Sequence, residues 1–149
     1  MAQRLPPLEV ANRVNAANDL FKKKILDIAK KMAVLIDEIS PDFKDGLKTL
    51  ADPFMASIVS FDRSINVVWQ YWPDVPSGDL FYNTKKHLEA AIPFLTRVKI
   101  VHLGKPIGLS IGIIIRLVED AIKFTADPFG VKAEGKILHQ IDGAQNLFV

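Results

Sequence analysis

The chain has 149 residues, of which 49% are hydrophobic and 24% charged, with a formal net charge of +2 at pH 7 and no cysteine. This composition is typical of one globular domain that is long enough to bury a core, and it argues against a disordered chain. The lack of cysteine excludes disulfides, thiolate catalysis, zinc ribbons and iron–sulfur clusters. So small a net charge does not by itself indicate a nucleic-acid or membrane partner.

The N-terminal sequence MAQRLPPLEV carries one arginine and no apolar stretch, so it does not resemble a secretory signal. The most apolar run, Ile107 to Ile115, is much shorter than the roughly 20 residues that a membrane-spanning helix needs. We therefore expect a chain without a transmembrane segment, located inside a cell or in a virion. Residues 1–7 are expected to form an extended N-terminal arm.

Residues 8–39 have the pattern of a long amphipathic helix. Asn18 and Asp19 lower the helix propensity in the middle, so one long helix and two collinear helices both fit the pattern. Ser40-Pro41 should end the run, because a residue before proline resists the helical conformation. Nine apolar residues recur every three or four positions and form one stripe: Val10, Val14, Ala17, Phe21, Ile25, Ile28, Met32, Leu35 and Ile39.

The tetrapeptide Ala-Asp-Pro-Phe occurs twice, at residues 51–54 and 126–129. In the first occurrence Asp52 suits an N-cap and Pro53 suits the first helical position, which predicts a helix whose apolar stripe reaches Trp72. The second occurrence should end one helix and could cap a short C-terminal one. Asp-Leu-Phe also occurs twice, but with a different offset, so an ancient duplication stays open and is not established.

The second half of the chain begins with a loop at residues 72–78, where two prolines and a glycine fall close together. A helix should follow, starting at Asp79 or Asn83 and ending at Leu103, with Pro93 kinking or splitting it. The last seven residues of this helix also alternate like a strand, but we predict a helix.

After a turn at Gly104-Lys105-Pro106, residues 109–124 are apolar on nearly every side in their first half. This pattern predicts the most buried helix of the molecule, either in the core or at an interface. The tail, residues 130–149, ends in three apolar residues that usually dock on the core or on a neighbour. The predicted architecture is an all-α, single-domain bundle of about four to five helices over residues 1–149, with an irregular C-terminal tail.

No pattern in the sequence indicates catalysis, a cofactor or a metal site. The three histidines lack the spacing of paired ligands, and Gly104-Lys105 lacks the glycine spacing of a phosphate loop. Ser57, Ser60 and Ser64 recur without a partnered histidine, and we interpret them as small residues that ease helix packing. We therefore expect a protein that is not an enzyme and that binds no metal or cofactor.

The order of the charges is more informative than the net charge. Six basic residues and two acids lie between residues 13 and 31, and six basic residues and one acid between residues 82 and 116, whereas residues 37–62 contain six acids and two lysines. A solvated lysine face is the usual explanation, and contact with nucleic-acid phosphates is the functional alternative. Nine residues are candidates for phosphate contact: Arg13, Lys23, Lys24, Lys30, Lys31, Lys85, Lys86, Arg97 and Lys99.

Basic segments beside an acidic one also suit head-to-tail contacts between copies, which form filaments when they do not close. With the long N-terminal helix and the apolar C-terminus, this arrangement is similar in architecture, though in no residue motif, to the α-helical coat proteins of archaeal filamentous DNA viruses. We therefore expect a non-enzymatic, self-associating assembly protein, a capsid or nucleoprotein coat subunit that contacts the phosphates of duplex DNA. The alternatives are a helical small subunit of an RNA-guided, nucleic-acid-processing complex and a peripheral lipid-binding protein.

Overall fold

The structure, a computed structural model, describes residues 8–72, 75 and 80–130. No strand occurs among these residues, so the predicted all-α bundle is confirmed. The N-terminal arm at residues 1–7 and the tail beyond residue 130 lie outside the described part. The described residues form six helices: α1 (Leu8–Leu35), α2 (Pro41–Thr49), α3 (Ala51–Tyr71), α4 (Tyr82–Glu89), α5 (Ile92–Val101) and α6 (Pro106–Ala126).

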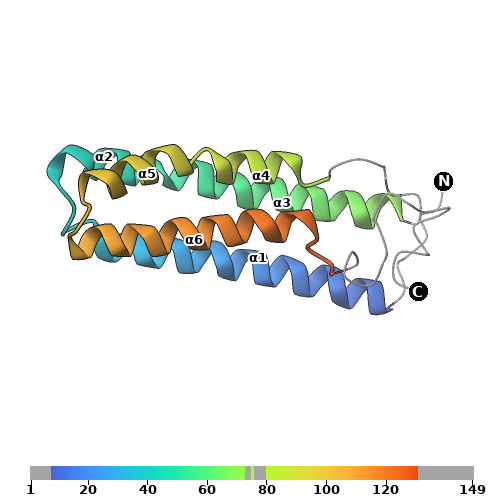
Figure 1. The fold of residues 1–149 in the computed structure, drawn as a ribbon. Helices are drawn as coiled ribbons and strands as arrows, with labels where there is room; N and C mark the ends of the chain where they lie inside the picture. The colour runs from blue at the N-terminus through green and yellow to red at the C-terminus, as the bar shows by residue number, and fades with distance from the viewer. Residues whose placement is uncertain (1–7, 73–74, 76–79, 131–149) are drawn as a thin grey trace.

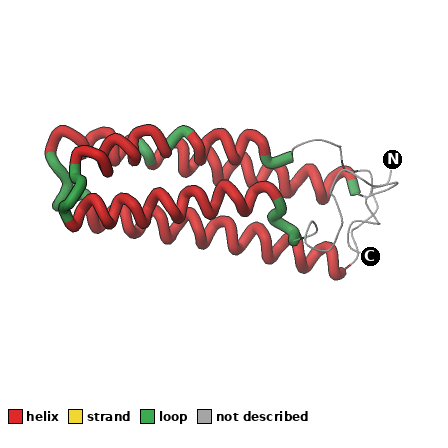
Figure 2. The backbone as a smooth tube through the Cα atoms, in the orientation of Figure 1, coloured by secondary structure: helices red, strands yellow, loops and turns green. Residues whose placement is uncertain are grey.

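The helices form four columns that run alternately up and down (Figures 1 and 2). α2 and α3 together make one column, α4 and α5 make another, and α1 and α6 make one each. Around the bundle, α1 packs against α3, α3 against α4, α4 and α5 against α6, and α6 against α1. Each column therefore contacts its two neighbours, as in an up-and-down four-helix bundle.

The apolar stripe of α1 is buried as predicted. Eight of the nine predicted residues, from Val10 to Leu35, lie on α1, and Ile39 in the following turn is buried in the core with them. The helix is continuous through Asn18 and Asp19, because packing of the stripe against α3 and α6 outweighs their low helix propensity. It ends at Leu35, a few residues before Pro41 begins α2.

A cluster of aromatic rings joins the four columns. Phe21 of α1 lies parallel to Phe61 of α3, with 4.3 Å between the ring centroids, and both side chains are fully buried. Phe124 of α6 stacks 6.2 Å from Phe61, and Phe81, which precedes α4, lies 4.9 Å from it. Each column thus has a phenylalanine in or next to it that reaches the same point of the core.

The first Ala-Asp-Pro-Phe segment does not start a helix in the predicted way. Leu50, between α2 and α3, has φ and ψ angles of −64° and −15°, which are helical, so α3 already begins at Ala51. The predicted N-cap role of Asp52 is therefore wrong, because an N-cap residue must lie outside the helical region and Asp52 lies in the first turn. Pro53 is also in this first turn, where its missing N–H leaves no intrahelical hydrogen bond unmade.

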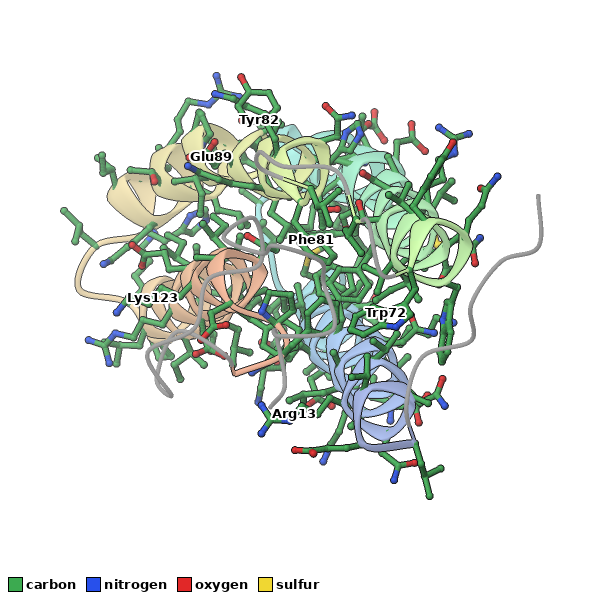
Figure 3. The ribbon with its side chains drawn as sticks, turned by 90° about the vertical axis from the view of Figure 1, so that its right-hand side faces the viewer. Arg13, Trp72, Phe81, Tyr82, Glu89 and Lys123 are labelled. Atoms are coloured by element: carbon green, nitrogen blue, oxygen red, sulfur yellow. The ribbon has the colours of Figure 1, made fainter. Side chains whose placement is uncertain are left out.

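The second Ala-Asp-Pro-Phe segment closes one end of the bundle. α6 ends at Ala126, as predicted, and the ring of Phe129 lies 5.8 Å from that of Phe81. Nη1 of Arg13 donates a hydrogen bond of 3.1 Å to the backbone oxygen of Phe129. Figure 3 views the bundle from this end, with Phe81 between the columns and Arg13 on α1. A helix after this segment would lie outside the described residues.

Pro93 splits the predicted helix of the second half into two. α4 ends at Glu89, and α5 begins at Ile92 with Pro93 in its first turn. The strand alternative for residues 97–103 is wrong, because α5 remains helical to Val101.

α6 is not the most buried helix that its composition predicted. Its inner face is buried, including Ile114, but Leu109 is 76% exposed and Ile113 is 49% exposed. The helix lies at the side of the bundle as one of four columns. The apolar composition of α6 therefore comes from one buried face and from apolar residues exposed on the opposite face.

Candidate functional site

The nine candidate phosphate contacts do not form one patch. Five of them lie on α1, two on α4 and two on α5. α1 packs against α3 and α6, and the column of α4 and α5 lies on the other side of these two helices. A single ligand surface can therefore include either the α1 group or the α4–α5 group, and α1 carries the larger one.

Lys24 and Arg13 hold parts of the bundle together. Nζ of Lys24 lies 2.7 Å from Oδ2 of Asp120 on α6, and the lysine side chain is only 24% exposed. The same ammonium group lies 5.5 Å from the ring centroid of Phe124. Arg13 is hydrogen-bonded to the backbone of Phe129. Both positive charges already interact within the molecule, so we expect them to contribute little to phosphate binding.

Lys86 and Arg97 make surface contacts on α4 and α5. Nζ of Lys86 lies 3.7 Å from a carboxylate oxygen of Glu89, and the guanidinium of Arg97 lies 5.4 Å from the ring centroid of Phe94. Exposed contacts of this kind are weak, and a ligand can replace them.

Lys23 and Lys30 form an accessible basic pair. Both are exposed on α1, and their separation of seven residues places them on the same outer face, about 10 Å apart along the helix. Asp27 lies between them in the sequence without forming an ion pair with either. Five candidates have no carboxylate of the described chain within ion-pairing distance: Lys23, Lys30, Lys31, Lys85 and Lys99.

An apolar groove of about 680 Å³ runs between α1 and the column of α2 and α3. Leu26 of α1 and Met55 of α3 contribute to its lining, although they are 53% and 60% exposed. The charged residues of the lining are Lys22, which pairs with Asp62 at 3.5 Å, and Lys48. Three alanines leave space in the groove: Ala29, Ala33 and Ala51.

A second apolar surface lies at the end of the bundle where α5 is followed by α6. Leu109 and Ile113 of α6 are exposed close to this turn. Val34, in the last turn of α1, lines a shallow recess of about 210 Å³ together with Ile113. The connection from α1 to α2 lies at the same end (Figure 1). Three residues at or near the end of α5 are each more than half exposed: Ile100, Val101 and Leu103.

The serines of α3 have the packing role that the sequence predicted. Ser57, Ser60 and Ser64 are buried. Oγ of Ser64 donates a hydrogen bond of 2.6 Å to the backbone oxygen of Leu80, and Oγ1 of Thr84 donates one of 3.1 Å to Oγ of Ser60. Ser60 and Ser64, which line part of a recess of about 460 Å³ between α3 and α4, therefore already make hydrogen bonds.

The described residues contain no group of three histidine, cysteine, aspartate or glutamate side chains that could hold a metal ion. His102 is buried, with Nδ1 2.8 Å from the backbone oxygen of Val98 and its ring against Phe43. His139 lies outside the described residues. Within the described ranges, no helix has the length and hydrophobicity that are needed to cross a membrane.

The groove and the apolar end of the bundle were not predicted from the sequence. Leu26, Val34 and Met55 fall beside the buried stripes, and a single apolar residue at such a position is ordinary on a protein surface. Their common location becomes visible only when the columns are assembled. Comparison of this chain with known protein families, with curated proteins and with solved structures found no match.

Proposed function

We propose that this protein is a non-enzymatic helical assembly protein, a coat-like subunit whose copies associate side by side through the groove between α1 and α3. The groove is the observation that supports the proposal. It is apolar in most of its lining, and it exposes two large side chains, Leu26 and Met55. Contiguous apolar surface of this kind on a folded protein usually marks a site of interaction.

A second copy of the chain is the occupant that the groove fits best. Leu26 and Met55 are large and exposed, whereas Ala29 and Ala33 in the same lining are small. Under a two-fold axis, the large side chains of one copy can fill the space above the alanines of the other. The flexible thioether of Met55 can adapt to such a contact.

The test compares two substitutions of exposed leucines on α1. Leu26 lies in the groove and Leu20 lies outside its lining, and they are 53% and 44% exposed, respectively. The wild type should self-associate with rising concentration in analytical ultracentrifugation. Leu26→Glu should weaken this association at least about tenfold, because a carboxylate would be buried at the contact.

Leu20→Glu is the matched control and should leave the association unchanged. Far-UV circular dichroism should show the same helix content for both variants. A wild type that stays monomeric at every concentration would contradict the proposal, as would equal effects of the two substitutions.

A second part of the proposal is contact with the phosphate backbone of duplex DNA. It is supported by Lys23 and Lys30, which are exposed, share the outer face of α1 and make no ion pair within the described chain. Neither residue contributes to the lining of the groove, so both surfaces can be occupied at once. Lysines arranged in this way bind phosphates without reading the bases.

The DNA contact is tested by titrating duplex DNA at several salt concentrations with the wild type and with Lys23→Gln/Lys30→Gln. The double substitution should weaken binding to all sequences alike and lower the slope of log affinity against log salt by about two units. Lys85→Gln/Lys86→Gln on α4 removes the same charge elsewhere and should lower the slope less. Equal slopes for all three proteins, or a wild type that does not bind DNA, would contradict the proposed DNA contact. Only the proposed self-association would then remain.

The two alternatives from the sequence predict other outcomes of the same experiments. A small subunit of an RNA-guided complex would prefer RNA and would remain a discrete particle. A peripheral lipid binder would sediment with vesicles of anionic lipid, and its binding would depend on exposed apolar residues beside lysines.

A further inference from the structure

We infer that the end of the bundle formed by the α1–α2 and α5–α6 connections docks onto the same end of a second copy, in a two-fold, end-to-end contact. The inference rests on the self-association proposed above, but it concerns a different surface. Residues 36–43 and 97–105 form this surface, which we call the paired-turn end. The two segments meet there, since the ring centroid of His102, directly after α5, lies 5.8 Å from that of Phe43 at the start of α2.

One half of the paired-turn end is acidic. Residues 36–43 contain three carboxylates and no lysine or arginine. Asp37, Glu38 and Asp42 are all exposed. No ion pair within the described chain neutralises these three carboxylates. Their combined field therefore favours a positively charged partner.

The other half of the paired-turn end is basic. Residues 90–118, which include all of α5 and the first half of α6, contain no aspartate or glutamate. Arg97, Lys99 and Lys105 are exposed in this stretch. Lys99 extends over α6, because a Cβ placed on Gly112 would lie 3.7 Å from its Nζ atom. The basic half thus faces outward from both α5 and α6.

Exposed apolar residues accompany the basic half. Val101 and Leu103 are each more than half exposed beside Lys105, and Leu109 follows in the first turns of α6. An interface needs such a desolvated apolar part, because exposed charge pairs alone contribute little affinity. The paired-turn end therefore has both features of a protein interface, apolar area and charges that set the orientation.

A second copy is the partner whose charges complement this end. When two copies meet under a two-fold axis, the acidic half of each faces the basic half of the other, and the complementary contact is made twice. A two-fold axis turned through a right angle in the plane of contact would instead bring like charges together. The surface is thus self-complementary in charge, and it favours one relative orientation of the two molecules.

Two charge reversals test the contact, both made in the Leu26→Glu protein so that the groove does not contribute. The first variant, Asp37→Lys/Glu38→Lys, makes both halves basic. The second, Lys99→Glu/Lys105→Glu, makes both halves acidic. Each variant alone should dimerise at least about tenfold more weakly than its parent, because like charges then face each other. An equimolar mixture should dimerise within about threefold of the parent, since every contact is again complementary.

Matched controls carry the same changes in net charge on the outer face of α1, at positions that are exposed as well: Asp19→Lys/Asp27→Lys and Lys23→Glu/Lys30→Glu. These controls should dimerise like the parent when studied alone. The measurement is the dimerisation constant from sedimentation velocity, at low salt and at high salt. Helix content from circular dichroism shows whether each variant is folded.

The inference is overturned if the reversals at the paired-turn end behave like the controls, or if the mixture does not recover. It is also overturned if Leu26→Glu alone abolishes all self-association, a result that would support the groove contact. A wild type that never associates contradicts both proposals. If the association of the wild type depends on Leu26 and not on the paired-turn end, only the end-to-end contact is contradicted.

Discussion

Asp52 shows that an Asp-Pro pair does not act as a helix cap when the backbone before it is already helical. Aspartate followed by proline is a strong local signal for a helix start, because the aspartate caps and the proline follows. In this chain Leu50 stays helical, so Asp52 is moved into the first turn of α3. Its carboxylate then acts on the dipole of the helix and not as a cap.

Substitution of Asp52 by asparagine separates these two roles. Asparagine caps a helix about as well as aspartate, so Asp52→Asn would be neutral if the residue were a cap. Because the charge interacts with the helix dipole instead, we expect Asp52→Asn and Asp52→Ala to lower the free energy of unfolding by similar amounts, about 0.3–1 kcal/mol. Urea denaturation at low and at high salt measures this, and the loss should shrink at high salt. A neutral Asp52→Asn with a destabilising Asp52→Ala would contradict the interpretation.

At the scale of the helix, α6 places opposite environments at consecutive positions. Ile114 is buried between the columns, and Ile113 is 49% exposed beside the recess that it shares with Val34. A change of the same chemistry at the two positions should therefore have different consequences.

Ile114→Asp should lower the free energy of unfolding by at least about 3 kcal/mol, because a carboxylate would be buried without a partner and a cavity would remain. Ile113→Asp should cost less than about 1 kcal/mol, since its side chain reaches solvent. Thermal and urea unfolding, followed by circular dichroism, give both values. Similar losses at the two positions would show that the outer face of α6 is covered.

The helices and their inner faces were largely predictable from the sequence, and the connections between them were less so. The stripe of α1 follows from the 3.6-residue period alone, and all of it is buried. The predicted start of α3 was wrong, because the helical conformation of Leu50 outweighed the capping preference of Asp52. The prediction from composition likewise overestimated the burial of α6, because apolar residues such as Leu109 lie on its outer face.

The candidate site was less predictable than the fold, because it depends on which helices lie side by side. Lys23 and Lys24 are adjacent in the sequence and look equivalent there. Lys24 pairs with Asp120, 96 positions away along the chain, whereas Lys23 lies on the outer face. Only the register between α1 and α6 decides this difference, and no local pattern encodes it.

At the scale of the whole molecule, the aromatic cluster makes the four columns one cooperative unit. Phe61 is fully buried and lies within stacking distance of Phe21, Phe81 and Phe124. We expect Phe61→Ala to lower the free energy of unfolding by about 3–5 kcal/mol.

The same change should shift the unfolding curves of circular dichroism and of tryptophan fluorescence together, because helix content and the surroundings of Trp69 and Trp72 depend on one core. Phe43→Ala, a partly buried ring away from this cluster, is the comparison and should cost less. Separate transitions for the two probes would mean that the bundle consists of independent units.

Two of the four columns each consist of two consecutive helices. α2 meets α3 at Leu50, and α4 meets α5 at Ala90 and Ala91, so α2 and α5 lie in the half of the bundle that carries the paired-turn end. The rings of Phe43 and Phe94, 6.2 Å apart, connect α2 with α5. α1 and α6 run past this level without a break. The backbone of Leu50, Ala90 and Ala91 keeps helical angles, so α2 and α5 extend their columns as far as this end of the bundle. A contact at this end would therefore be carried by all four columns, so a force between linked subunits would be shared by the whole bundle.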